Sequence, residues 1–131
     1  MIGLDTNVVI RYLMKDDAQQ FARADALIES AIKNNESLHI CLVVICEVVW
    51  VLKYHYKIKK EDICDFLEIL LHTDHMEVEN REIALNSFKA YQNSQADFAD
   101  CVIGYTNQFE GCTTTFTFDA QAIKLSSFSK L

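Results

Sequence analysis

Proline is absent from this chain, and glycine occurs only 3 times in 131 residues. Because 50% of the residues are hydrophobic, the composition excludes disordered, collagen-like and linker-rich chains. No apolar run approaches the roughly 20 residues of a membrane-spanning helix, and the first residues lack the features of a signal peptide. We therefore expect a single domain over residues 1–131 with a substantial core and no membrane partner.

Cysteine pairs with the spacing of metal or redox motifs are also missing. The 5 cysteines include no CxxC pair, so a zinc site is disfavoured. Cys41, Cys46 and Cys101 lie in apolar runs, which is typical of buried thiols that form no disulfide. The expected location is therefore a reducing cytoplasm.

Positive charge is scarce, with 12 Lys and Arg against 19 Asp and Glu and a net charge of −7. This balance argues against a protein that holds nucleic acid through its overall charge. A metal-dependent nuclease remains compatible with it, because a bound cation offsets the charge of the carboxylates that hold it.

Short strand-like runs alternate with segments of helical period. Strands are predicted at 2–4, 38–42, 76–78 and 113–118, and helices at 8–14, 17–33, 43–56, 60–72, 80–93, 97–109 and 120–125. This alternation predicts an α/β fold, in which a central parallel sheet of about four or five short strands is flanked by helices in an α/β/α sandwich. Ligands of such sheets bind beyond the carboxyl ends of the strands.

Glu47 is the only charged residue in the apolar stretch 38–52. An isolated carboxylate in apolar surroundings is costly unless it is paired or binds a ligand. Helical spacing places Glu47 on one face with Val43, Trp50, Val51 and Tyr54. We expect Trp50 to be buried in the core, and the alternative is an exposed interface that includes Tyr12, Trp50 and Tyr54. A single salt bridge is the alternative role for Glu47.

Four further acids lie where predicted elements meet. Asp5 and Asp119 follow strands, and Asp97 and Asp100 begin a helix at i and i+3. Taken singly, the first two are explained as helix caps, and the other two as first-turn acids favoured by the helix dipole. Their joint occurrence with Glu47 favours a shared site for a hard divalent cation.

The segments LDTNVVIRYL, CEVVWVL and ADFADCVIGYTNQFEGCTTTFTFD resemble those of PIN domains, most closely the VapC ribonuclease toxins of bacterial toxin–antitoxin pairs. The resemblance covers nearly the whole chain. One departure is Cys101-Val102-Ile103-Gly104, where many relatives have Ala-Leu-Ile-Ala, which alters helix packing but not the acids. The resemblance implies catalytic roles for Asp5, Glu47, Asp100 and Asp119, metal binding by Asp5, Asp100 and Asp119 with Glu47 and Asp97 as further candidates, and supporting polar roles for Thr6, Asn7 and Thr117.

The implied activity is hydrolysis of RNA phosphodiester bonds with one or two Mg²⁺ or Mn²⁺ ions, which acidify water and stabilise charge on the phosphate. The implied partners are an RNA substrate, a cognate antitoxin and a second copy of the chain. Cations near aromatic side chains are candidates for RNA contact, although a solvated helix end explains them equally well. These candidates are Arg11, Lys15, Lys53, Lys57, Lys59 and Lys60.

Two other functions stay open. A haloacid-dehalogenase-type Mg²⁺ phosphatase also begins with a strand that ends in Asp, but its chemistry needs a second Asp where this chain has Asn7. A non-catalytic binding module with the same fold is the other alternative, and the complete set of acids argues against it. The metal site alone does not distinguish RNA from DNA.

Overall fold

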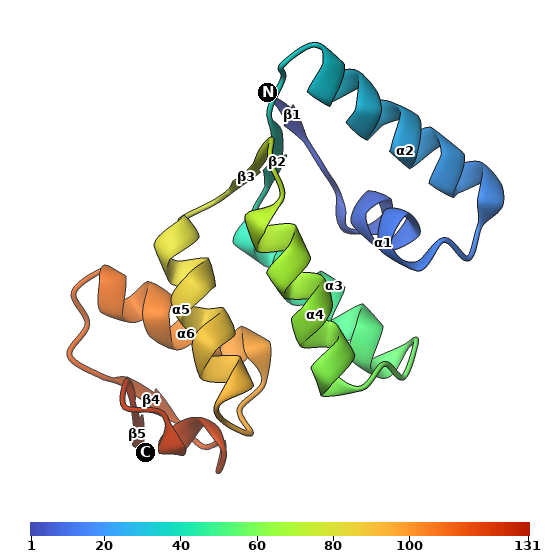
Figure 1. Cartoon of the computed structure of the whole chain (residues 1–131). Helices are drawn as coiled ribbons and strands as arrows, with labels where there is room; N and C mark the ends of the chain where they lie inside the picture. The colour runs from blue at the N-terminus through green and yellow to red at the C-terminus, as the bar shows by residue number, and fades with distance from the viewer. The chain divides into compact units, whose positions relative to one another are not determined.

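The computed structural model describes residues 1–131 and divides the chain into two compact units, Met1–Glu79 and Asn80–Leu131. We call them the N-terminal unit and the C-terminal unit (Figure 1). Helices and parallel strands make up both units, which confirms the α/β class. None of the helices has the length and apolar character needed to cross a membrane. The assignment of residues 1–131 to one domain stays a prediction.

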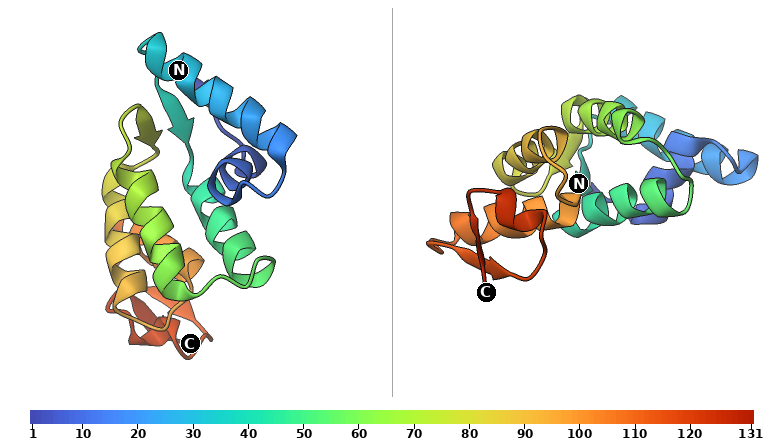
Figure 2. Two further views of the ribbon diagram at one scale, coloured as in Figure 1. Left: turned by 45° about the vertical axis from the view of Figure 1, so that its right-hand side comes forward. Right: turned by 90° about the horizontal axis from the view of Figure 1, so that it is seen from below.

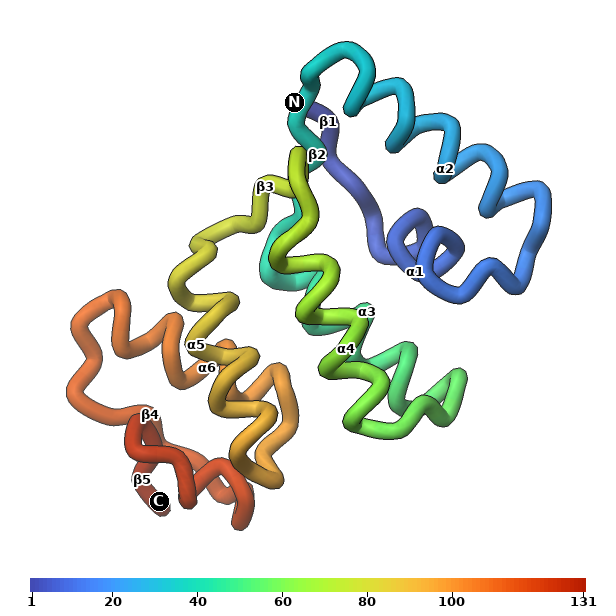
Figure 3. The backbone as a smooth tube through the Cα atoms, viewed as in Figure 1, coloured from blue at the N-terminus to red at the C-terminus, as the bar shows by residue number.

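The N-terminal unit contains a three-stranded parallel sheet in the order β1-β2-β3, with the central Leu38 paired to Ile2 and to Met76. Helices connect the strands, as parallel neighbours require. Figure 3 shows the chain passing from β1 into α1 and returning through α2 to β2. The elements are β1 (Ile2–Gly3), α1 (Thr6–Met14), α2 (Ala18–Lys33), β2 (Leu38–Ile40), α3 (Leu42–Tyr54), α4 (Lys60–His72) and β3 (Met76–Val78).

The core of this unit is built on β2 and α4. Leu38 and Ile40 of β2 are 1% and 0% exposed. Ile63, Leu67 and Leu71 recur at helical spacing on α4 and are fully buried. Burying each such side chain contributes about 1.5–3 kcal/mol. Strand β1, after which Asp5 follows, pairs with the buried β2.

The C-terminal unit pairs two helices with a two-stranded parallel sheet. Helices α5 and α6 run side by side (Figure 2), and the rings of Tyr91 and Phe98 meet edge to face at 5.7 Å. In the sheet, Thr115 of β4 pairs with Phe128 of β5. The elements are α5 (Arg81–Gln92), α6 (Phe98–Phe109), β4 (Thr115–Thr117), the 3₁₀ helix η1 (Ala122–Lys124) and β5 (Phe128–Lys130).

The central parallel sheet has three strands, slightly fewer than the four or five expected, and β4 and β5 form a two-stranded sheet. The prediction for the last helix is wrong. The expected helix over 120–125 is only the short 3₁₀ turn η1, and β5 was not predicted. The polar sequence around Phe128 has no strand pattern of its own, so its pairing with β4 is what makes it a strand.

Candidate active site

Asp5 follows β1 and occupies the N-cap position of α1, with φ −83° and ψ 161°. Its backbone carbonyl accepts hydrogen bonds from the N–H groups of Val8 and Val9 at 3.1 and 3.3 Å. Its side chain makes no capping hydrogen bond and is exposed. Helix capping therefore does not explain the Asp5 side chain, and its carboxylate is available to a ligand.

Thr6 and Glu47 join α1 to α3 through their side chains. The Thr6 hydroxyl donates a short hydrogen bond to Oε2 of Glu47. Thr6 is only 6% exposed, whereas Glu47 is exposed. The expectation that Glu47 lies in buried apolar surroundings is therefore wrong. Its specific partner is the buried hydroxyl of Thr6, and no salt bridge explains it.

Helix α3 is apolar on two opposite faces, and only one of them faces the core. The exposed face carries Val43, Trp50 and Tyr54, at 65%, 61% and 45% exposure. The rings of Trp50 and Tyr54 lie 5.5 Å apart. The expected core burial of Trp50 is therefore wrong. The core face consists instead of Leu42, Val44, Ile45, Val48, Val49 and Leu52.

The C-terminal unit brings three predicted acids into electrostatic contact. Asp100 lies half-buried in the first turn of α6. Burial raises the pKa of its carboxyl, and the negative charges of Asp119 and Asp97 raise the pKa further. Like charges disfavour one another's ionised form, so Asp119 and Asp97 each lie close enough to Asp100 to affect its carboxyl.

Asp119 is held in place by the turn that follows β4. Its Oδ1 accepts hydrogen bonds from the N–H groups of Gln121 and Ala122 at 2.9 and 2.8 Å. Its own N–H donates to the Thr117 hydroxyl at 3.0 Å. Asp119 therefore has a local structural role in addition to its effect on Asp100, and Thr117 positions it through the backbone.

The chemistry of these residues fits a hard divalent cation. Asp5 and Glu47 belong to the N-terminal unit, and Asp97, Asp100 and Asp119 to the C-terminal unit. In neither unit do three such side chains form a complete metal-binding group. Mg²⁺ needs only one or two carboxylates because it keeps several waters. Burial raises the pKa of the Asp100 carboxyl most, and a cation beside it would relieve the added repulsion from Asp119 and Asp97.

The predicted RNA-binding cations have varied surroundings. Nε of Arg11 donates to Gln20 Oε1 at 2.6 Å, and its Nη1 donates to the Tyr56 hydroxyl at 2.9 Å. Nζ of Lys15 lies 5.2 Å from the centre of the Phe21 ring. A role in RNA binding stays a prediction for Arg11 and Lys15 and for the lysines of the α3–α4 region, which are Lys53, Lys57, Lys59 and Lys60.

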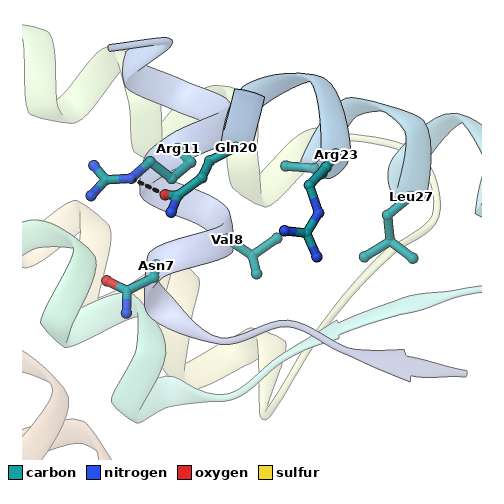
Figure 4. Close-up of a pocket in the computed structure, with 7 residues that line it drawn as sticks. Asn7, Val8, Arg11, Gln20, Arg23 and Leu27 are labelled. Carbon is teal, nitrogen blue, oxygen red and sulfur yellow. Dashed lines mark hydrogen bonds between the residues drawn. The ribbon is translucent and has the colours of Figure 1, made fainter. Parts of the chain in front are cut away.

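One residue that the sequence analysis did not single out is Arg23. It lines a cavity of about 360 Å³ formed by α1 and α2, together with Asn7, Arg11 and Gln20 (Figure 4). The available signal was the spacing of residues 20, 23 and 27 on one face of α2.

Comparison with known proteins gives two matches. A model of the PIN domain family matches residues 2–127, which span both units and include every acid named above. The chain is also 26% identical over 122 residues to a VapC ribonuclease from Aquifex aeolicus (strain VF5), and the alignment covers 93% of this chain and 90% of that protein. No solved structure gives a significant match. The matches confirm the resemblance drawn from the sequence.

Proposed function

Because the chain belongs to the PIN domain family, we propose that it is a metal-dependent endoribonuclease and the toxin of a VapBC-type toxin–antitoxin pair. Its similarity to a VapC ribonuclease over nearly the full length of both chains supports this activity. The structural observation that carries the proposal is the half-buried Asp100 in the first turn of α6, where burial and the charges of Asp119 and Asp97 raise the pKa of its carboxyl. A half-buried carboxyl whose pKa is raised by burial and by neighbouring acids is typical of functional sites, and such surroundings favour a bound cation.

The proposal assigns a role to each of the five acids. Asp5, Asp100 and Asp119 are the proposed ligands of Mg²⁺ or Mn²⁺, and Glu47 and Asp97 support them. The ion, when bound, supplies acidification of water and stabilisation of negative charge on the phosphate. The chain orients two of these carboxylates, those of Glu47 and Asp119, through hydrogen bonds, which saves reorganisation during the reaction.

Two hydroxyl groups serve this purpose. The Thr6 side chain is buried, so its bond to one carboxylate oxygen of Glu47 restricts the rotamers of an exposed acid. The Thr117 hydroxyl accepts from the Asp119 N–H, and Asp119 is further fixed by two backbone donors. Such supporting hydrogen bonds keep ligand side chains in productive geometry.

The proposed partners are an RNA substrate, a cognate antitoxin and a second copy of the chain. The exposed Val43, Trp50 and Tyr54 support binding of a protein partner, because exposed apolar patches commonly mark interaction sites. None of the 5 cysteines forms a disulfide, which supports action in the cytoplasm.

The test is cleavage of RNA with Mg²⁺ or Mn²⁺ by the wild type, Asp5→Ala, Asp100→Asn and the control Asp74→Asn. Asp74 is an exposed acid between α4 and β3 with no role in the proposal. We expect cleavage by the wild type and the control only. Equal cleavage by Asp5→Ala would assign the activity to a contaminating nuclease or another site. A DNA oligonucleotide of the same sequence, tested in parallel, shows whether the sugar matters.

A further inference from the structure

The cavity formed by α1 and α2 in the N-terminal unit has the composition of an anion site. Its volume is about 360 Å³, within the range of small-ligand pockets, and no carboxylate lines it. Figure 4 shows its side chains extending from the two helices. The lining residues that matter here are Asn7, Val8 and Arg11 of α1, and Gln20, Arg23 and Leu27 of α2.

The two arginines of the cavity differ in their partners. Arg11 is held by Gln20 and Tyr56 and lies 3.4 Å from Oδ1 of Asp16, so protein groups already satisfy much of its guanidinium. Arg23 makes no hydrogen bond or ion pair, and positions 19, 20, 26 and 27 of α2, its i±3 and i±4 neighbours, carry no acid. Arg23 is exposed, so its guanidinium is free to bind an anion, and no acid lines the cavity beside it to compete.

The position of the cavity links it to the proposed reaction. Asn7 lines the cavity and lies two residues after Asp5 at the start of α1. The cavity also has an apolar side formed by Val8 and Leu27. Proteins bind unpaired nucleotides through cations that contact phosphates and through aromatic or apolar side chains that contact bases, and here the surface for the base is aliphatic.

We propose that this cavity is a substrate subsite, in which Arg23 binds a backbone phosphate of single-stranded RNA next to the cleaved bond and Val8 and Leu27 contact the attached nucleoside. The planar fork of arginine suits a phosphate. Gln20 keeps the Arg11 guanidinium at the rim of the cavity through its bond to Nε. The proposal rests on the ribonuclease function above, and it adds a substrate-binding residue outside the acids.

The test measures RNA binding without cleavage. A fluorescein-labelled RNA octamer is titrated in EDTA with wild type, Arg23→Gln, Arg23→Lys and the control Lys33→Gln, and anisotropy is followed over a salt series. Lys33 is an exposed cation at the end of the same helix and does not line the cavity. We expect Arg23→Gln to weaken binding several-fold and to reduce the slope of log K against log[salt] by about 0.7, the value for one single-strand phosphate contact.

The other variants control for charge and folding. Lys33→Gln should keep the wild-type slope, and Arg23→Lys should keep the slope while losing part of the affinity. Arg23 is exposed and unpaired, so all variants should have the melting temperature of the wild type. Wild-type affinity and slope in Arg23→Gln would overturn the proposal. Equally tight binding of 5′-AMP and the octamer to the wild type would assign the cavity to free nucleotides instead.

The two proposals fail separately. Binding in EDTA does not depend on cleavage. If Arg23→Gln weakens RNA binding as expected but the wild type shows no metal-dependent cleavage, the ribonuclease function is refuted and a nucleic-acid site remains. Cleavage that is lost in Asp5→Ala, with unchanged binding by Arg23→Gln, would keep the ribonuclease and remove the subsite.

Discussion

The hydrogen bond between Thr6 and Glu47 should be measurable as a coupling energy in a double-mutant cycle. Thr6→Val removes the donor and preserves the shape of the side chain, while Glu47→Ala removes the acceptor. The two partners differ in burial, because Thr6 is 6% exposed and Glu47 lies on the exposed face of α3. The two single substitutions should therefore have unequal effects on the free energy of unfolding.

The difference follows from what each substitution leaves behind. After Thr6→Val, water can solvate the exposed Glu47 carboxylate, so we expect a loss of about 0.5–1 kcal/mol. After Glu47→Ala, a buried hydroxyl loses its partner at a cost of about 1–3 kcal/mol, reduced by roughly 0.4 kcal/mol through the better helix propensity of alanine. Because the carboxylate is exposed and partly screened, the coupling between the two sites should be near 1 kcal/mol.

The assay is guanidinium unfolding of the wild type, both single variants and the double variant, followed by far-ultraviolet circular dichroism. The double variant should be about 1 kcal/mol more stable than the sum of the single effects implies. Additivity within about 0.3 kcal/mol would refute the bond as a stabilising interaction. A larger loss for Thr6→Val than for Glu47→Ala would refute the argument from burial.

Three further predictions follow from other contacts. Gly104→Ala should destabilise the protein by about 1–3 kcal/mol in guanidinium melts, because its Cβ would lie 2.6 Å from an aromatic ring carbon of β5; a gain in stability would contradict this packing. Burial raises the pKa of Cys46 to about 11, so iodoacetamide at pH 8 should label the exposed Cys112 and spare Cys46, as read by peptide mass mapping. A hydrogen bond from the Tyr56 hydroxyl lowers the pKa of Asp16 below its usual 3.8. The ionised Asp16 therefore stabilises the folded protein above about pH 4, and this stabilisation is lost as the pH falls and the carboxyl becomes protonated. The melting temperatures of Asp16→Asn and the wild type should therefore converge towards pH 2.

Local sequence determined the elements whose apolar pattern and boundaries agreed. Helix α4 begins and ends at Lys60 and His72 as predicted, because its buried residues recur at helical spacing between polar turns. The strand after which Asp5 follows was also predictable, since a short apolar run there gives way to polar residues. In these segments propensity, pattern and tertiary packing favour the same structure.

The sequence was ambiguous where only tertiary packing decides which face of a helix is buried or whether a segment pairs as a strand. Helix α3 is apolar on two faces, so its period could not show that Glu47 and Trp50 lie on the exposed one. Strand β5 depends on its partner β4 for pairing, and its residues alone do not predict it. The spacing of residues 20, 23 and 27 placed Arg23 on one face of α2, but that spacing could not show the cavity, which forms only when α1 and α2 pack together.

Structural and functional roles of an acid are not mutually exclusive, and the two acids that follow strands show why this matters. Asp119 caps a turn through Oδ1, so replacing it disturbs the local backbone as well as any ligand site. Asp5 makes no capping bond with its side chain, so the same replacement there leaves the backbone bonds of α1 in place. Loss of cleavage in an Asp119 variant therefore mixes two causes. Loss of cleavage in Asp5→Ala reports on the carboxylate itself, and that is why Asp5→Ala is the decisive variant for the proposed function.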